Sequence, residues 1–442
     1  MKTPIFDFVT EYAKKKRIRM HMPGHKGTGN TEKYDITEIS GADSLYEASG
    51  IIRESEENAS RLFGADSFYS TEGSSLSIRA MLMLISLYAK SEGKSNLILA
   101  ARNAHKVFIS GIALLGSEVE WIGTDGESYL SPDVTPESVE NSIISLPEKP
   151  TAVYITSPDY LGNMPNVRGI AEVCHRHGVL LAVDNAHGAY LKFLEKSLHP
   201  IDLGADICCD SAHKTLPCLT GAAYLHISKN APESFRKSAK SALALFGSTS
   251  PSYLILASLD KANAYLASDF KEELRTTVQS LENLKNELKS LGYTLYGNEP
   301  MKLTVKAKPY GYLGTELAEK LEACGIITEF SDRDFLTLMP STKTKDSEFE
   351  ATLEAFASVE KRAPISEEPP KAVLAKRALS PREAVLSASE FVSAEAALGR
   401  VLADVTVGCP PAVPIIVSGE KVDENAIKAF KYYDIKMLKV VK

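Results

Sequence analysis

The sequence predicts an α/β protein: a large domain on a mostly parallel sheet, a smaller α/β domain and a C-terminal α+β module. Three observations support this. Short apolar runs rich in β-forming residues alternate with helical patterns from about residue 60, which is typical of parallel strands joined by helical crossovers. The 442 residues are 44% hydrophobic, enough for more than one core. A stretch rich in Pro and Glu, "KRAPISEEPPKA" at 361–372, separates the last part of the chain.

The first expected element is an amphipathic helix at the start of the chain. Thr3 can cap it, Pro4 suits its first turn, and the apolar residues between positions 5 and 12 share one face. We expect this helix to pack on a larger body.

The large domain follows as an alternation of helices and strands. One helix runs from Ser75 towards Ala89, another follows His105, and a third surrounds "IAEVCHRHG" at 170–178. The expected strands are "NLILAA" (96–101), "EVEWIG" (118–123), "AVYITS" (152–157), "VLLAVD" (179–184), "DICCD" (206–210) and "AAYLHIS" (222–228). A helical stretch from about Tyr253 to Leu291 ends the series.

The smaller domain has its own strand and helix patterns. They are "MKLTVKA" (301–307), a helix near "ELAEKLEACG" (316–325), "IITEFS" (326–331) and "FLTLMP" (335–340). We therefore divide the chain into an N-terminal helix and arm (1–55), a large domain (56–265), a small domain (266–362) and, after the linker, a C-terminal module (373–442).

Composition and charge limit the classes of ligand that the protein is expected to bind. A net charge of -7 disfavours a surface for nucleic acid or anionic membranes, so we expect a small-molecule ligand. The longest apolar stretch, near "MLMLISLYA", is too short to span a bilayer, and we expect a cytoplasmic protein. The six cysteines show no CxxC spacing, which favours buried free thiols and no metal site. "GHKGTG" lacks the GxGxxG order and no GxxxxGK[ST] occurs, so nucleotide binding is not indicated.

The dipeptide His-Lys occurs three times, at 25–26, 105–106 and 213–214. Ligands of an open parallel sheet gather at the carboxyl ends of its strands. Lys214 follows the strand "DICC" and Asp184 ends the buried strand "VLLAVD", so both leave the same edge. His105 follows "NLILAA" and can join them, whereas His25 precedes the sheet.

A lysine beside an aspartate at such an edge indicates a site for pyridoxal phosphate. The amine condenses with the cofactor aldehyde, and the carboxylate keeps the pyridine nitrogen protonated, so that the ring accepts electrons. Ala186 extends to the same side as Asp184, and its small side chain lets the ring lie close. In "STEGSSLSIRAML", Gly73, Ser74 and Ser75 at a helix start can hold the phosphate.

At these residues the chain resembles the Orn/Lys/Arg decarboxylase family, pyridoxal-phosphate enzymes of the aspartate-aminotransferase-like fold. The resemblance is carried by "MHMPGHKG" (20–27), "FGAD" (63–66), "RNAHKV" (102–107), "TSPDYLG" (156–162), "VDNAHGAY" (183–190), "DSAHKT" (210–215), "STSPSY" (248–253) and, in the last module, "CPPAVPIIVSGE" (409–420). It implies a mostly parallel seven-stranded sheet and a homodimer or larger assembly with active sites at the subunit interface.

The resemblance also implies roles for single residues. Lys214 would form the Schiff base, Asp184 would pair with the ring nitrogen, and His105 would stack on the ring face opposite Ala186. The residues implied to hold the phosphate are Ser74, Ser75, Ser211, His213 and, reaching across a dimer interface, Ser248 and Thr249. His187 would lie behind the cofactor or beside the substrate.

The sequence departs from the family pattern at several positions. These departures leave the core chemistry in place but do not determine the identity of the substrate. "DNAHGAY" stands for the usual "DEAHGAH", Glu72 for an Asn before the phosphate-loop glycine, and "CPPAVP" for "YPPGIP". The chain begins too close to "PGHK" for the N-terminal wing domain of the long members, so we do not expect their decameric assembly.

The acidic segment 35–47 is either a solvated loop or the partner of the substrate's distal cation, for which we favour Asp43. His25 would belong to an arm over an active site, its own or a neighbouring subunit's.

The implied reaction is decarboxylation of a basic amino acid in polyamine metabolism, with arginine to agmatine favoured and lysine to cadaverine or ornithine to putrescine next. Another reaction on the same fold, transamination or aldolase-type cleavage, is a first alternative. An aminotransferase usually fixes the substrate carboxylate with an arginine, which spacing does not identify here. A pyridoxal-phosphate-binding regulatory protein without turnover is a second alternative, and the set of Lys214, Asp184 and His105 argues against it.

Overall fold

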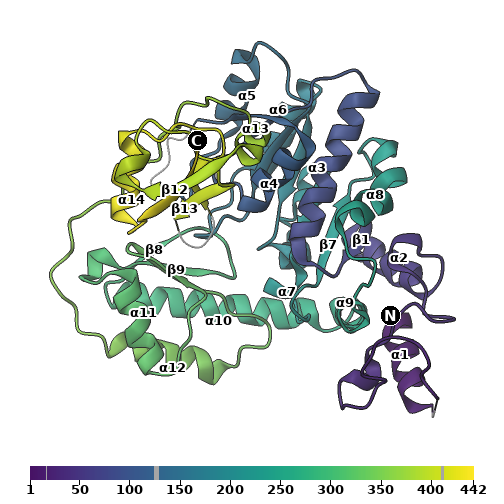
Figure 1. Ribbon diagram of the computed structural model, residues 1–442. Helices are drawn as coiled ribbons and strands as arrows, with labels where there is room; N and C mark the ends of the chain where they lie inside the picture. The colour runs from purple at the N-terminus through teal and green to yellow at the C-terminus, as the bar shows by residue number, and fades with distance from the viewer. Residues whose placement is uncertain (16, 124–128, 410–412) are drawn as a thin grey trace. The chain divides into compact units, whose positions relative to one another are not determined.

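The computed structural model describes residues 1–15, 17–123, 129–409 and 413–442, so part of "CPPAVP" lies outside the described residues. The chain forms two compact units (Figure 1). Unit 1 comprises Met1–Asn96, Thr151–Val153 and Val167–Glu272, and unit 2 comprises Leu97–Pro150, Tyr154–Asn166 and Glu273–Lys442. Among the helices that the structure describes, none combines the length and apolar composition needed to cross a membrane.

Seven strands form the main sheet, in the order β1-β7-β6-β5-β4-β2-β3. Their bounds are β1 (Asp66–Ser70), β2 (Leu97–Ala100), β3 (Glu118–Trp121), β4 (Ala152–Thr156), β5 (Leu180–Asp184), β6 (Ile207–Asp210) and β7 (Ala223–Ile227). β5 runs parallel to β6 and β2 parallel to β3, while β7 is antiparallel to β6 and β1. The expected seven-stranded, mostly parallel sheet is confirmed. Every residue of β5, β6 and β7 is buried, which explains their continuous apolar runs.

The helices of unit 1 are α1 (Pro4–Lys14), α2 (Ile51–Phe63), α3 (Gly73–Ser91), α6 (Val167–Arg176), α7 (Ala212–Thr215), α8 (Glu233–Phe246) and α9 (Tyr253–Leu266). α3 and α8 lie side by side (Figure 1). α1 buries the apolar face that its pattern predicts, but Thr3 makes no capping hydrogen bond from its side chain. Instead Asp260 of α9 accepts hydrogen bonds from the backbone N–H groups of Ile5 and Phe6, at 2.8 and 3.0 Å.

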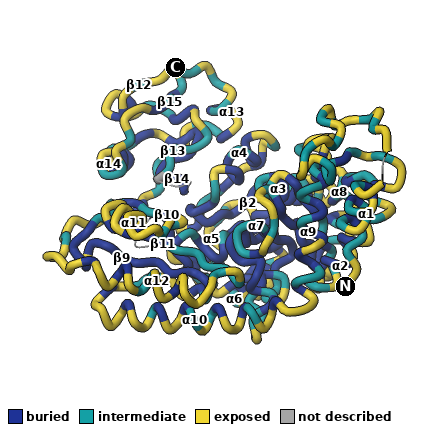
Figure 2. The backbone as a smooth tube through the Cα atoms, turned by 90° about the horizontal axis from the view of Figure 1, so that it is seen from below, coloured by how far each residue is buried: buried dark blue, intermediate teal, exposed yellow. Residues whose placement is uncertain are grey.

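Unit 2 contains two smaller cores. The first lies between an antiparallel sheet of order β10-β11-β9-β8 and its helices. In the second, apolar residues of the C-terminal module pack with Tyr129, Leu130, Leu161, Phe330 and Phe335. The first set is β8 (Thr294–Tyr296), β9 (Leu303–Lys306), β10 (Phe330–Ser331), β11 (Phe335–Leu338), α10 (Phe270–Ser290), α11 (Gly314–Ala323) and α12 (Asp346–Ala357). The second is α13 (Pro381–Leu386), β12 (Ser389–Ser393), β13 (Thr406–Cys409), β14 (Val413–Val417), α14 (Glu424–Tyr432) and β15 (Met437–Val441). Figure 2 shows exposed residues recurring along one side of α10, as its amphipathic sequence requires.

Two expectations need correction. The helical stretch from Tyr253 to Leu291 is two helices, because Ser268 bonds back to the carbonyl groups that end α9. "IITEFS" is a strand only at Phe330–Ser331, where β11 offers partners. The short strand β8 had no sequence signal that we recognised. The division into four domains stays a prediction.

Candidate functional site

Lys214 lies just after β6, in the short helix α7. Its Nζ is 2.9 Å from Nε2 of His187. His187 is 3% exposed and follows β5, the parallel neighbour of β6. Two adjacent strand ends therefore bring an amine and an imidazole into contact, at the edge where ligands of parallel sheets gather.

Asp184 ends β5 and is 2% exposed. Its Oδ1 accepts hydrogen bonds from the backbone N–H of Ala186 at 3.1 Å and from the thiol of Cys209 at 3.6 Å. Cys209 stands opposite it in the register of β5 and β6. The sequence-predicted pair of Asp184 and Lys214 thus leaves neighbouring strands of unit 1.

A buried hydrogen-bond network lies next to Asp184. Nδ2 of Asn185 donates to Oδ1 of Asp210 at 2.6 Å. Nε2 of His199 and of His226 lies 3.0 and 3.2 Å from Oδ2 of the same aspartate. Burial alone would raise the pKa of Asp210, but the two imidazoles hold it below its usual value. The network fixes Asn185, the chain neighbour of the proposed cofactor carboxylate.

The same network includes a group that sequence spacing does not reveal. His199, Cys208 and Asp210 place one potential metal-ligand atom each within 4.8 Å of one another. The expectation of no metal site rested on cysteine spacing along the chain, which does not detect ligands that the fold assembles. Two of the three, His199 and Asp210, are already joined by a hydrogen bond of 3.0 Å in this network.

Gly73, Ser74 and Ser75, three of the residues expected to hold a phosphate, form the start of α3. Gly73 has a φ of 69°, and a Cβ built there would find nothing within 4 Å among the residues described. Ser74 and Ser75 follow it and are half-buried. Glu72 precedes it and accepts a hydrogen bond from the backbone N–H of Ser248 at 2.6 Å. Ser248 therefore reaches this helix end within one chain, and the exposed Thr249 follows it.

His213, beside Lys214, makes a hydrogen bond that limits how its ring can bind a phosphate, and sequence reasoning missed this bond. Its Nδ1 lies 3.1 Å from the carbonyl oxygen of Ala222 and 3.5 Å from Oγ of Ser211. Because a carbonyl oxygen only accepts, Nδ1 holds the proton of the ring. Nε2 can then donate to a phosphate only when the imidazole is doubly protonated.

His105 belongs to unit 2. It follows β2 and caps α4 (Lys106–Leu115), with Nδ1 accepting from the backbone N–H of Val107 at 3.2 Å. In the same loop, Nη2 of the buried Arg102 lies 2.8 Å from Oε2 of Glu420 in the C-terminal module. The guanidinium also stacks over Trp121 at 4.7 Å. The C-terminal module thus fixes the loop that carries His105. Stacking of His105 on a cofactor ring stays a prediction, since it would join the two units.

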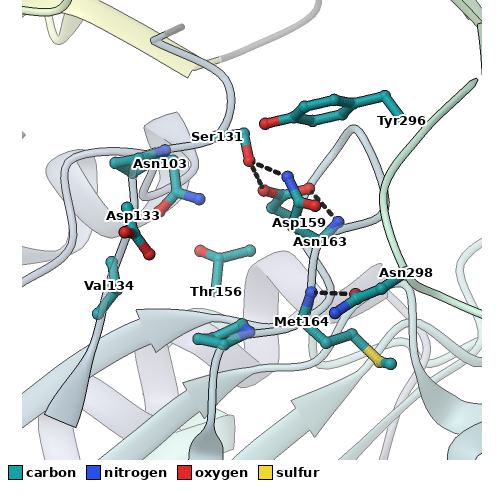
Figure 3. Close-up of a pocket in the computed structure, with 12 residues that line it drawn as sticks. Asn103, Ser131, Asp133, Val134, Thr156, Asp159, Asn163, Met164, Tyr296 and Asn298 are labelled. Atoms are coloured by element: carbon teal, nitrogen blue, oxygen red, sulfur yellow. Dashed lines mark hydrogen bonds between the residues drawn. The ribbon is translucent and has the colours of Figure 1, made fainter. Parts of the chain in front are cut away.

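Unit 2 also holds a pocket of about 380 Å³ beyond the ends of β2 and β4 (Figure 3). Asp159 in its wall is 3% exposed and accepts hydrogen bonds from Oγ of Ser131 at 2.5 Å and from two backbone N–H groups at 2.9 Å. Burial raises the pKa of Asp159. Figure 3 shows the side chains of Asn103, Asp133 and Thr156 facing the same space. Sequence reasoning missed this pocket because its walls come from distant segments.

Asp43, favoured for the distal cation of the substrate, caps α2. Its carboxylate accepts hydrogen bonds of 2.8 to 3.4 Å from the backbone N–H groups of Ser44, Ser49, Gly50, Ile52 and Arg53. Burial would raise the pKa of Asp43, but these bonds lower it. A further role in substrate binding stays a prediction.

His25 is also held locally. Its Nε2 lies 3.1 Å from Oδ2 of Asp35, and its Nδ1 accepts from the backbone N–H of Gly27. These contacts fold the "PGHKG" loop onto itself within unit 1. Its expected place over an active site is still untested.

Two family models match the chain. Residues 3–308 match "Orn/Lys/Arg decarboxylase, major domain", and residues 361–440 match the C-terminal domain of the same name. An arginine decarboxylase of Halalkalibacterium halodurans is 29% identical over 96% of this chain and 91% of its own. An arginine decarboxylase of Bacillus subtilis is 26% identical over 98% and 94%. The uncharacterised YaaO protein of Bacillus subtilis is 30% identical over 97% and 93%.

Solved structures resemble the whole fold. The lysine decarboxylase LdcF of Francisella novicida gives a TM-score of 0.82 at 18% identity, covering 100% of this chain and 81% of its own. A constitutive lysine decarboxylase of E. coli gives 0.79 at 18% identity, with 100% and 82% covered. At this identity the likeness speaks for the fold alone, and it agrees with the architecture expected from the sequence.

Proposed function

Because the chain belongs to the Orn/Lys/Arg decarboxylase family, we propose that it is a pyridoxal-phosphate-dependent decarboxylase that converts arginine to agmatine and CO2. The observation that carries the proposal is the 2.9 Å contact between Lys214 and His187, beside the buried Asp184. Arginine is favoured over lysine and ornithine because relatives that align over nearly their whole length are named arginine decarboxylases.

The residues present are compatible with the cofactor. The open space at Gly73 and the N–H groups at the start of the 19-residue helix α3 suit a phosphate group, with the hydroxyls of Ser74 and Ser75 as further donors. Lys214 would hold the aldehyde carbon and Asp184 the ring nitrogen. When bound, the cofactor supplies an aldehyde for amines and a conjugated ring that accepts electrons.

The remaining chemistry belongs to side chains of the protein. An amine is a nucleophile only after its ammonium form loses a proton, and Nε2 of His187 is within reach of the Lys214 ammonium. The burial of His187 keeps bulk water away from that exchange. The buried carboxylate of Asp184 provides a negative charge where a protonated ring nitrogen needs one.

A product assay tests the proposed reaction. Protein loaded with pyridoxal phosphate is given arginine, lysine or ornithine, and CO2, amine and keto acid are measured. We expect agmatine and CO2 from arginine as the fastest reaction. Transfer of the amino group to a keto acid without CO2 would identify an aminotransferase. No product from any of the three would identify a binding protein without turnover.

A substitution tests the role of Lys214. Lys214→Ala should abolish turnover, by at least about 1,000-fold, and also the visible absorbance of the Schiff base, because no other amine is expected to react. Lys289→Ala on the surface of α10 is the matched control and should change neither. Retention of the absorbance in Lys214→Ala would refute the assignment.

A further inference from the structure

One buried carboxylate of unit 1, that of Asp210, lies at the base of two turns. Asp210 ends β6, and the next turn is closed by a 3.0 Å hydrogen bond from the backbone N–H of Lys214 to the carbonyl oxygen of Ser211. The second turn follows β5, where the backbone N–H of Gly188 donates to the carbonyl oxygen of Asn185 at 2.9 Å. Nδ2 of Asn185 donates to Oδ1 of Asp210. The chain after Asp210 thus presents Lys214, while its side chain holds the first residue of the neighbouring turn.

The turn of residues 185–188 carries His187. Asn185 is fully buried and ties this turn to β6 twice, because its backbone N–H also donates to the carbonyl oxygen of Cys209 at 3.0 Å. Nε2 of His187, in the middle of the turn, lies 2.9 Å from Nζ of Lys214. A change in the orientation of Asn185 therefore moves the imidazole relative to the amine.

Three N–H groups point at the carboxylate of Asp210. A carboxylate only accepts hydrogen bonds, so Nε2 of His199 and of His226, 3.0 and 3.2 Å away, each carry a proton. Nδ1 of His226 lies 2.8 Å from the hydroxyl oxygen of Ser67, which can donate to it. Burial lowers the pKa of His226, which favours this neutral ring. The third donor is the amide of Asn185, which extends the network to the turn that carries His187.

Residue 185 has to supply a hydrogen-bond donor. Asn185 stands where the family pattern has Glu, and a glutamate would direct a second acceptor at Asp210 and repel its charge. Oδ1 of Asn185 has no hydrogen-bond partner among the residues that the structure describes, so the bond to Asp210 sets the orientation of the amide. Asn185 and Asp210 are therefore a matched donor and acceptor.

We propose that Asp210 is a positioning residue, which holds the turn 185–188 through Asn185 so that His187 faces Lys214. The inference rests on the proposed function, in which His187 takes a proton from the Lys214 ammonium. In this role Asp210 acts through Asn185 and needs no contact with the substrate or the cofactor.

The rate of Schiff-base formation in cofactor-free protein tests this role. Stopped-flow absorbance after mixing with pyridoxal phosphate follows the reaction of Lys214, which requires that its ammonium lose a proton. Asn185→Leu keeps the size of the side chain and removes the donor. The rate should fall about 10- to 100-fold, the loss expected for a misplacement of about 1 Å. Asn286→Leu, at an exposed position of α10, is the matched control and should leave the rate unchanged. An unchanged rate in Asn185→Leu, with folding verified by circular dichroism, would overturn the inference.

A double-mutant cycle separates positioning from a general loss of stability. His187→Asn removes the proton acceptor itself and should slow the same step about 100-fold. Because Asn185 acts through His187, Asn185→Leu should slow the reaction less than about twofold further in the His187→Asn background. A general loss of stability would slow both backgrounds equally. Equal slowing would therefore assign Asn185 a structural role and contradict the inference.

An exchanged pair decides the case in which Asn185→Leu does not fold. Asn185→Asp sets two carboxylates against each other and should slow or prevent Schiff-base formation. Adding Asp210→Asn restores one donor and one acceptor in reversed order, and the oxygen of the new amide can still accept from the two imidazoles. The rate should return to that of the wild type within about threefold. No recovery in the double variant would refute the role of Asp210.

Wild-type protein separates this inference from the proposed function. If it forms the Schiff base and produces agmatine while every variant forms the Schiff base at the wild-type rate, the positioning role is wrong and the reaction stands. If wild-type protein forms no Schiff base with pyridoxal phosphate, the proposed function fails and the inference fails with it.

Discussion

At the scale of single residues, Glu72 places a carboxylate at the helix end that is proposed to hold a phosphate. A negative charge near the start of a helix favours the helix itself but repels a second anion. Its oxygen already accepts a hydrogen bond from Ser248, which keeps the loop at 248–249 beside α3. Glu72 would therefore order the proposed phosphate site while weakening its attraction for the ligand.

Glu72→Gln should tighten the binding of pyridoxal phosphate. The amide still accepts the hydrogen bond from Ser248, while a repulsion of roughly 1 kcal/mol disappears, which corresponds to an about fivefold lower Kd. Titration of the cofactor-free protein, followed by Schiff-base absorbance, measures this. Glu92→Gln at the other end of α3 should leave the Kd unchanged. A weaker affinity in Glu72→Gln would place the phosphate elsewhere.

The sequence predicts the roles of some residues of the site and not of others. Lys214 and Asp184 could be singled out because each directly follows or ends a buried strand, and strand ends share an edge. The capping role of Asp43 gives no such signal, because the helix that it caps starts eight residues later. Asp133 and Thr156 gave no signal, because only the fold brings their segments to one pocket.

At the scale of elements, the pair of Arg102 and Glu420 joins the loop after β2 to the C-terminal module. Both side chains are nearly inaccessible, at 1% and 2% exposure. Burial raises the pKa of Glu420 and the neighbouring guanidinium opposes this. A buried pair of this kind is costly to break, because the remaining charge is left in a poor environment.

Glu420→Gln should destabilise unit 2 by about 3–5 kcal/mol, since it leaves the Arg102 charge unpaired. Trp121 under that guanidinium is the sole tryptophan of the chain, so its fluorescence reports the event in a urea titration. Glu390→Gln breaks an exposed pair with Arg400 and should cost less than about 1 kcal/mol. Equal midpoints for the two variants would show that burial does not strengthen the pair.

Asp260, which accepts hydrogen bonds from the start of α1, should make the stability of the fold depend on pH. Burial raises the pKa of Asp260 to about 6, whereas an unfolded aspartate titrates near 3.9. A raised carboxyl pKa stabilises the folded chain below about pH 4, and this contribution is lost as pH rises through 6. The contribution of Asp260 to the free energy of unfolding, measured by urea titration, should therefore fall by roughly 2 kcal/mol between pH 4.5 and 7. Asp260→Asn should remove this dependence, and an unchanged slope in the variant would contradict the assignment.

Elements with long periodic or buried patterns were predictable, and short or capped ones were not. β5 and β6 are continuous apolar runs and were found at their observed positions. The break between α9 and α10 depends on one serine bonding back to the helix, and α1 takes its cap from a residue 255 positions away. Such contacts follow from tertiary structure and leave no local pattern.

At the scale of the whole molecule, we expect a homodimer. Ile18, Met20 and Met22 are 90%, 90% and 69% exposed, which is unusual for apolar side chains in one short segment. Light scattering after size exclusion should give twice the chain mass of 48.1 kDa. Replacing Met20 and Met22 by Ser should shift the protein towards monomer, whereas replacing the isolated, exposed Leu114 should not. A wild-type mass of one chain would refute the dimer.

The long separation of Arg102 and Glu420 in the sequence also matters during protein synthesis. The ribosome releases the arginine 318 residues before its partner, a delay of roughly 15 to 60 s at common elongation rates. During that interval the nascent chain carries a guanidinium whose final environment does not yet exist. Premature stop codons at or before position 420, which remove this glutamate, should therefore yield aggregated or degraded chains, and the most reliable expression tags will be those that leave the C-terminal module intact.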